Sequence, residues 1–148
     1  DDGGGLMALV VSWYRSGLET LTPSGWDARV DDKVLAIEHG MGWSFDATDT
    51  TLTDLALGGC ELVATGYSRA SLVTGAPVFS SGRWTLPLSA VVWASCGTAE
   101  QVAAFVGYEA GVDDATSVPL WVLRDSGGAS IVTLDGTDLT LSMDLGVT

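Results

Sequence analysis

Short apolar runs separated by turn-forming residues constrain the fold of this chain more than any other feature. From residue 33 onward the runs are about four to eight residues long, and clusters of Gly, Pro, Ser and Asp lie between them. Runs of this length between such breaks are typical of strands joined by turns. They span residues 33–38, 61–64, 71–74, 83–88, 90–93, 102–108 and 120–124.

The composition of two segments predicts where each lies in a sheet. The run Val102-Ala103-Ala104-Phe105-Val106 is apolar at every position, which predicts a strand buried on both faces in the middle of a sheet. Near the C-terminus, residues 130–134 lead into Asp135-Gly136, a favoured two-residue turn, so we expect a hairpin. In its second strand apolar residues alternate with polar ones, namely Leu139, Leu141, Met143 and Leu145 with Asp138, Thr140, Ser142 and Asp144.

One N-terminal helix precedes these strands in our prediction. Apolar residues from Leu6 to Leu21 recur at steps of three and four, and Pro23 and Gly25 then end the pattern. A short helical turn is also expected at residues 52–57, where Thr51, Thr53 and Asp54 are candidate capping residues. The expected fold is therefore mainly β: a single-domain β-sandwich or flattened barrel with one helix. We assign residues 1–6 to a flexible leader and residues 7–148 to this β-rich domain.

The charge balance excludes several classes of partner. The 148 residues include 19 acidic and 6 basic side chains, so 6 − 19 gives a net charge of −13. Only 17% of residues are charged, against about 25% in an average domain, so the acidity reflects missing Lys and Arg. We expect no nucleic-acid or membrane partner, because both require a basic surface or a long apolar span. An apolar fraction of 47% also excludes intrinsic disorder.

Residues that carry catalytic chemistry are sparse. The single histidine, His39, has no Gly-x-Ser-x-Gly nucleophile motif to serve, and we interpret it as a strand-end residue bonded to backbone or water. Adjacent acids such as Asp113-Asp114 are typical of turns rather than of paired catalytic carboxylates. Cys60 and Cys96 permit one disulfide, but buried free thiols are the favoured interpretation. We expect no enzyme activity and no cofactor.

Metal binding has one candidate segment. Asp46, Asp49 and Asp54 lie within nine positions and offer the oxygen ligands that Ca²⁺ prefers. Their spacing does not match the EF-hand loop, so solvated turns are the favoured interpretation and no metal site is assigned.

The six tryptophans are the main candidates for surface contacts. Trp13 and Trp93 lie in apolar patterns and are expected to be buried. Trp26, Trp43 and Trp84 have polar or glycine neighbours and are predicted to be exposed, where they either anchor a protein interface or stack on sugar rings.

Several phrases in order resemble a family of small virion structural proteins of tailed bacteriophages, described as minor tail, capsid-decorating or head-fibre proteins. The phrases include Met7-Ala8-Leu9, Trp26-Asp27, Asp31-Asp32-Lys33-Val34-Leu35, Phe45-Asp46, Leu52-Thr53-Asp54-Leu55, Glu61, Gly66-Tyr67-Ser68-Arg69, Tyr108, Gly111, Asp113-Asp114-Ala115-Thr116-Ser117, Leu120 and Gly136-Thr137-Asp138-Leu139-Thr140-Leu141. The resemblance spans residues 7–148. It implies a non-catalytic particle component, and Tyr67 and Arg69 join the interface candidates.

The expected function is a structural role on the capsid or tail surface of a phage particle, assembled in the bacterial cytoplasm. Partners would be other virion proteins and further copies of this chain. A carbohydrate-binding β-sandwich for host attachment is the alternative, with a glycan as its partner. Because charged residues are few, we expect assembly contacts to be largely apolar and only mildly sensitive to salt.

Overall fold

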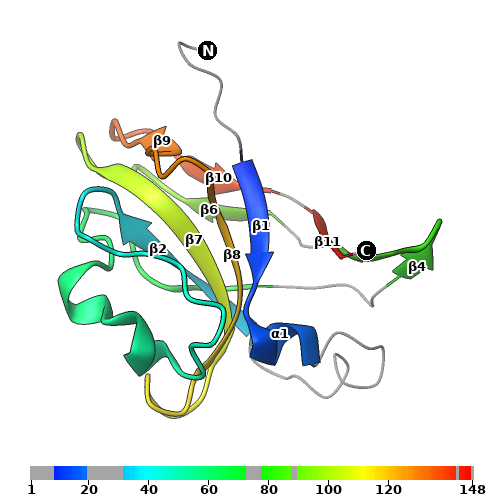
Figure 1. The fold of residues 1–148 in the computed structure, drawn as a ribbon. Helices are drawn as coiled ribbons and strands as arrows, with labels where there is room; N and C mark the ends of the chain where they lie inside the picture. The colour runs from blue at the N-terminus through cyan, green and yellow to red at the C-terminus, as the bar shows by residue number, and fades with distance from the viewer. Residues whose placement is uncertain (1–8, 20–31, 73–77, 88–89, 143, 148) are drawn as a thin grey trace.

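The fold of this chain is mainly β, as the sequence predicts. The computed structural model describes residues 9–19, 32–72, 78–87, 90–142 and 144–147. Figure 1 shows the elements in chain order: β1 (Leu9–Trp13), α1 (Arg15–Glu19), β2 (Asp32–Glu38), the 3-10 turns η1 (Leu52–Leu55) and η2 (Leu57–Gly59), β3 (Ala70–Ser71), β4 (Val78–Ser80), β5 (Arg83–Pro87), β6 (Val91–Trp93), β7 (Gln101–Glu109), β8 (Val118–Asp125), β9 (Val132–Thr133), β10 (Leu139–Leu141) and β11 (Asp144–Val147).

The strands form one large sheet and two small ones. The large sheet has the order β1-β8-β7-β2-β3, all antiparallel, and β9 pairs with the start of β7 beside the end of β8. In the described residues this order begins at β1 and ends at β3, so the sheet is open rather than a closed barrel. The small sheets are β6–β10 and β4–β5–β11.

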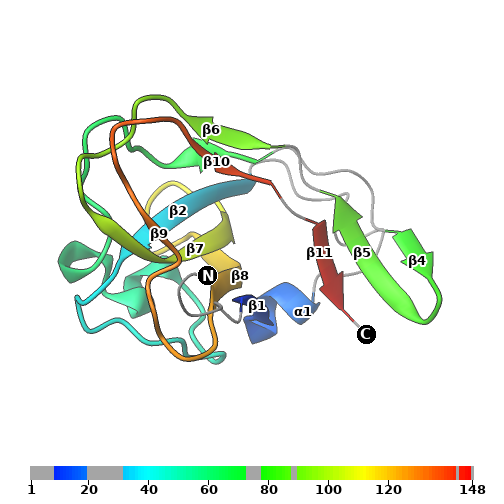
Figure 2. The ribbon, with the colours of Figure 1, turned by 90° about the horizontal axis from the view of Figure 1, so that it is seen from above.

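Two apolar cores lie on opposite faces of the large sheet. Along β2 the side chains alternate, so that Val34 and Ala36 enter one core while Leu35 and Ile37 enter the other. The first core is closed by the β6–β10 pair, with Val91, Trp93, Leu139 and Leu141. The second core is closed by the η1 and η2 turns, with Leu52, Leu55 and Leu57. Figure 2 shows β6 and β10 lying across one face and the β4–β5–β11 sheet to one side.

The central strand β7 confirms the prediction made from its composition. Val102, Ala104, Phe105 and Val106 are at most 4% exposed, and β2 and β8 flank the strand. Opposite it, β8 carries a bulge at Leu120, so that Leu120 and Trp121 both enter the first core. The indole of Trp121 then lies directly against the backbone of Gly107, where a Cβ would collide with the ring.

The predicted N-terminal helix is wrong over residues 9–13. These residues form β1, which pairs along its whole length with β8 and brings Trp13 opposite Trp121. Helical structure is limited to α1, while Leu6 and Leu21 lie outside the described residues. Val10, Val11 and Trp13 favour strand, and the exposed hydrogen-bonding edge of β8 stabilises that choice. Trp13 is consequently half-buried rather than buried.

The predicted C-terminal hairpin is also wrong, although its alternation is correct. Leu139 and Leu141 are buried while Thr140 is exposed, but β10 pairs with β6, β11 with β5 and β9 with β7. At the predicted turn, the Asp135 carboxylate accepts hydrogen bonds from the backbone and hydroxyl of Thr137. The segment therefore crosses from one sheet to another, because its apolar side chains cover the large sheet rather than each other.

Other segments follow the prediction more closely. The runs 33–38, 83–88, 90–93, 102–108 and 120–124 coincide with β2, β5, β6, β7 and β8, and the turn at 52–57 with η1 and η2. The run 61–64 is not a strand, because only Glu61 forms a bridge, with Ile37. Of the run 71–74, Ser71 ends β3, and residues 73–74 lie outside the described part.

Replacing Gly107 with alanine is expected to lower the free energy of unfolding by about 2 kcal/mol, because the added methyl must displace the buried Trp121 ring. Gly59→Ala is the matched control, since a Cβ there meets nothing within 4 Å. Urea unfolding followed by tryptophan fluorescence measures both. Equal stability of the two variants would contradict the close packing of Gly107 on Trp121.

Candidate functional site

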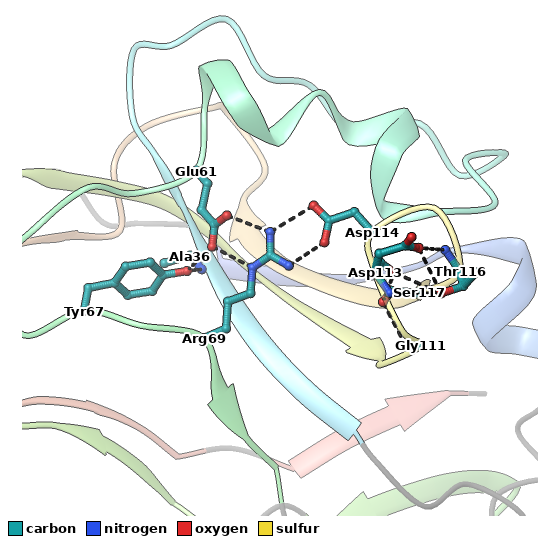
Figure 3. Close-up of polar contacts among 9 residues, drawn as sticks. All are labelled: Ala36, Glu61, Tyr67, Arg69, Gly111, Asp113, Asp114, Thr116 and Ser117. Atoms are coloured by element: carbon teal, nitrogen blue, oxygen red, sulfur yellow. Dashed lines mark hydrogen bonds and ion pairs between the residues drawn. The ribbon is translucent and has the colours of Figure 1, made fainter.

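Two of the predicted interface residues, Tyr67 and Arg69, meet in one network of charged and polar groups (Figure 3). The Arg69 guanidinium donates from Nε to Glu61 Oε2 at 2.9 Å and from Nη2 to Glu61 Oε1 at 2.8 Å. Its Nη1 donates to Asp114 Oδ1 at 2.7 Å. The Tyr67 hydroxyl donates to Glu61 Oε2 at 2.8 Å and accepts from the backbone N–H of Ala36 at 2.9 Å. We call Glu61, Tyr67, Arg69 and Asp114 the arginine clamp.

The arginine clamp joins three segments that are distant in sequence. Glu61 is held beside β2 by its bridge to Ile37, and Arg69 directly precedes β3. Asp114 lies in the loop between β7 and β8. That loop is itself ordered by its neighbour Asp113, which accepts from the backbone N–H and hydroxyl of Thr116 and, through its carbonyl, from the hydroxyl of Ser117. The clamp thus fixes a loop of the β7–β8 end against the edge of the sheet.

The electrostatics of the arginine clamp keep Asp114, Arg69 and Tyr67 in their usual charge states. Hydrogen bonds from Arg69 lower the pKa of Asp114, so its carboxylate stays ionised. Hydrogen bonds to Glu61 and Asp114 raise the pKa of Arg69 further above its high ordinary value. Burial raises the pKa of Tyr67, so its hydroxyl keeps its proton at neutral pH. The observed contacts of these groups are with one another and with the backbone of Ala36.

The predicted tryptophan candidates have different outcomes. Trp43 is half-buried in the loop that follows β2. Trp84 lies in β5, but its side chain is outside the described residues, as is the whole of Trp26. Trp93 is 4% exposed, as predicted, and its indole N–H donates to the Ser68 carbonyl at 2.7 Å.

His39 and the two cysteines are the other residues whose side chains could take part in catalysis. His39 follows β2, and its backbone N–H donates to the Gln101 carbonyl at 2.8 Å. Cys60 and Cys96 are buried free cysteines, as predicted, and burial raises the pKa of both thiols. A thiol protonated at neutral pH is a poor nucleophile.

The acidic loop around Asp46 uses its carboxylates on its own backbone. Asp46 accepts from the backbone and hydroxyl of Thr48, and Asp54 accepts from the backbone of Thr50 and Thr51. These bonds lower the pKa of both carboxyls, whereas burial raises the pKa of Asp49. Within the described residues, no three His, Cys, Asp or Glu side chains are grouped so that they could hold a metal ion.

A groove of about 290 Å³ lies where the loop after β2 meets the end of β8. Its lining includes Trp43, Phe45 and Arg124, together with the turn Ser126-Gly127-Gly128. Of these residues only Trp43 is a contact candidate in the sequence analysis. The available signals were the Trp-x-Phe spacing and one arginine in an otherwise apolar strand, and neither reveals that the two segments meet.

Comparison with protein-family models, with curated proteins and with solved structures finds no match for this chain. No helix among the described residues has the length and apolar character needed to cross a membrane.

The arginine clamp makes a testable contribution to stability. Arg69→Gln is expected to lower the free energy of unfolding by about 1–2 kcal/mol, because it leaves two carboxylates without their cation at a partly exposed site. Arg15→Gln, at an exposed position of α1, should change stability by less than about 0.5 kcal/mol. Chemical denaturation at pH 7 compares them, and a negligible effect of Arg69→Gln would show that the clamp does not stabilise the fold.

The pH dependence of stability should carry the signature of Asp114. Its folded-state pKa is lowered, so its stabilisation is complete above the ordinary value of 3.8 and is lost as the pH falls through the lower folded-state pKa. The wild type should lose stability as the pH falls below about 4. Asp114→Asn should be less stable at pH 7 and show a shallower loss over that window. Urea midpoints between pH 7 and pH 2 give both profiles, and parallel profiles would contradict the pairing.

Proposed function

We propose that this chain is a non-catalytic structural component of a tailed bacteriophage particle, which acts on the capsid or tail surface by protein–protein contact. The observation that carries the contact role is the exposed apolar edge strand β4. On this strand Val78 is 54% exposed and Phe79 is 60% exposed. A large aromatic side chain on the outside of a short strand is typical of a contact surface.

The position of β4 suits contact with another chain. It forms the end of the three-stranded sheet β4–β5–β11, and among the described strands it pairs only with β5. Figure 2 shows this sheet standing to one side of the two-core body. A strand at the end of a sheet can accept a strand from a partner, and its outward side chains then contact that partner.

The surface elsewhere agrees with contacts that are apolar rather than charged. Further large apolar side chains are exposed on several elements, namely Leu9, Leu18, Met41, Val63 and Val92. The low charged fraction of 17% leaves few groups for ion pairs between subunits. Association through β4 should therefore change little with salt.

The phage assignment is supported by the sequence resemblance. Four of the residues quoted for it, Glu61, Tyr67, Arg69 and Asp114, belong to the arginine clamp. Residues that fix loop geometry can be common to proteins that share a fold but no active site. Another virion protein or a second copy of the chain is the expected partner of β4.

The contact role is tested on the β4 surface itself. Phe79→Asp should abolish association in light scattering at increasing protein concentration, because burying a carboxylate in an apolar contact is unfavourable. Val112→Asp is the matched control, since Val112 is 97% exposed in the β7–β8 loop. A monomeric wild type that also binds no capsid or tail protein of the phage would overturn the proposal.

The particle assignment needs a separate measurement. Electron micrographs of purified phage labelled against this chain should show the label at fixed positions on the head or the tail. Incorporation of the Val112→Asp variant and loss of the Phe79→Asp variant would connect the β4 surface to assembly. Intact particles without label would refute the virion location.

A further inference from the structure

The groove beside Trp43 combines an aromatic wall with groups that form hydrogen bonds. Trp43 and Phe45 contribute rings, Arg124 a guanidinium and Asp125 a carboxylate, and Gly127 and Gly128 expose backbone at the rim. Small-molecule sites share this character, a mostly apolar hollow with few convergent polar groups. The volume of about 290 Å³ lies near the lower end of their range of roughly 300–1,000 Å³. The groove therefore fits one ring-sized group.

The rim of the groove is held in place. One oxygen of Asp125, Oδ2, accepts from the backbone N–H of Gly127 at 2.8 Å and of Ala129 at 3.1 Å. The Asp125 carbonyl also accepts from the backbone N–H of Gly128. The turn is thereby closed on itself, and its glycine backbone stays beside the arginine.

Arg124 supplies the charge of the groove. Its Nη2 donates to Ser12 Oγ at 3.2 Å, and its guanidinium carbon lies 5.2 Å from the centre of the Phe45 ring. Phe45 also packs on Tyr14, with ring centres 4.9 Å apart. Whereas Arg69 is neutralised by two carboxylates, the ion pairs among the described residues include none with Arg124. Arg124 thus keeps a positive charge beside the groove in a chain of net charge −13.

Two buried donors in the groove walls have no acceptor. Trp43 Nε1 and Arg124 Nε are both shielded from solvent and form no hydrogen bond. Buried donors are almost always paired in folded proteins, because an unpaired one costs about 1–3 kcal/mol. Because both atoms belong to side chains that line the groove, an oxygen-rich ligand seated there would offer the acceptors that the fold does not supply.

We propose that this groove binds one pyranose unit of a glycan, with a sugar carboxylate accepting from Arg124 and the sugar ring packed on Trp43. A pyranose offers an apolar face for an aromatic ring and a rim of oxygens for buried donors. The backbone carbonyls of the exposed glycine turn can accept hydrogen bonds, which sugar hydroxyls donate and a sulfate does not. The negative net charge of the chain repels an acidic sugar at long range. Salt screens this repulsion beyond about 8 Å, so the contact with Arg124 determines whether the sugar carboxylate binds.

The site lies on the loop after β2 and the end of β8, while the proposed assembly contact lies on β4. A sugar site on a particle component would serve attachment to a cell surface. It does not depend on the assembly role, because sugar binding is measured on the isolated chain and association on β4 variants.

Nuclear magnetic resonance of the ¹⁵N-labelled chain tests the proposal, with glucuronate, glucose and acetate as probes. Glucuronate at millimolar concentration should shift the indole N–H of Trp43 and the Nε–H of Arg124. Glucose should bind more weakly, and acetate should leave the indole signal unchanged. Arg124→Gln should weaken glucuronate binding about tenfold, which corresponds to one charged hydrogen bond, and change glucose binding little.

Two variants of Trp43 separate stacking from folding. Trp43→Phe keeps an aromatic face but loses the indole N–H, so it should retain part of the glucuronate affinity, whereas Trp43→Leu should lose it while keeping the same thermal midpoint within a few degrees. Arg15→Gln is the charge-matched control, since Arg15 does not line the groove. The proposal is overturned if neither sugar shifts the two signals, if acetate acts as glucuronate does, or if Trp43→Leu binds as well as Trp43→Phe.

Discussion

The burial of β7 on both faces is the constraint on which the rest of the structure depends. A strand whose central residues are all apolar must lie between two apolar layers, and each layer must be supplied by other parts of the chain. The β6–β10 pair covers one face and the η1–η2 turns cover the other. The close approach of Trp121 to Gly107 fills the first core at its centre and fixes the register of β8 against β7. The fixed register in turn sets where the loops that join these strands begin and end.

The sequence predicts what depends on local composition and misses what depends on distant partners. The prediction that residues 102–106 form a central strand is confirmed, because an all-apolar run is stable only where both of its faces are buried. Residues 9–13 match a helical period as well as a strand, and the choice is made by pairing with residues 121–125, more than a hundred positions away. Likewise Asp135-Gly136 is a good turn, but β10 finds its partner in β6. Propensity cannot reveal either pairing.

The same limit applies to the candidate sites. Tyr67 and Arg69 were identified as contact residues, and the structure gives them internal partners, Glu61 and Asp114, that no spacing rule connects to them. The polar neighbours of Trp43 in the sequence predict it as a contact residue. Arg124 becomes a candidate only because the fold places it in the same groove. A groove formed by the loop after β2 and the end of β8 has no signature in either segment alone.

The placement of the arginines relates the charge balance to the two proposals. With only six basic residues in the chain, most acids cannot be paired, and several, including Asp46, Asp54 and Asp135, bind their own backbone instead. Acids that bind their own backbone keep loops ordered without ion pairs to neighbouring chains, which agrees with the apolar contact that we propose at β4. Arg69 is committed to the arginine clamp. Arg124 lies over Phe45 with no carboxylate partner among the described ion pairs, so its charge is available to a ligand. In a chain this poor in cations, a cation beside an aromatic groove favours recognition of an acceptor over a purely structural role.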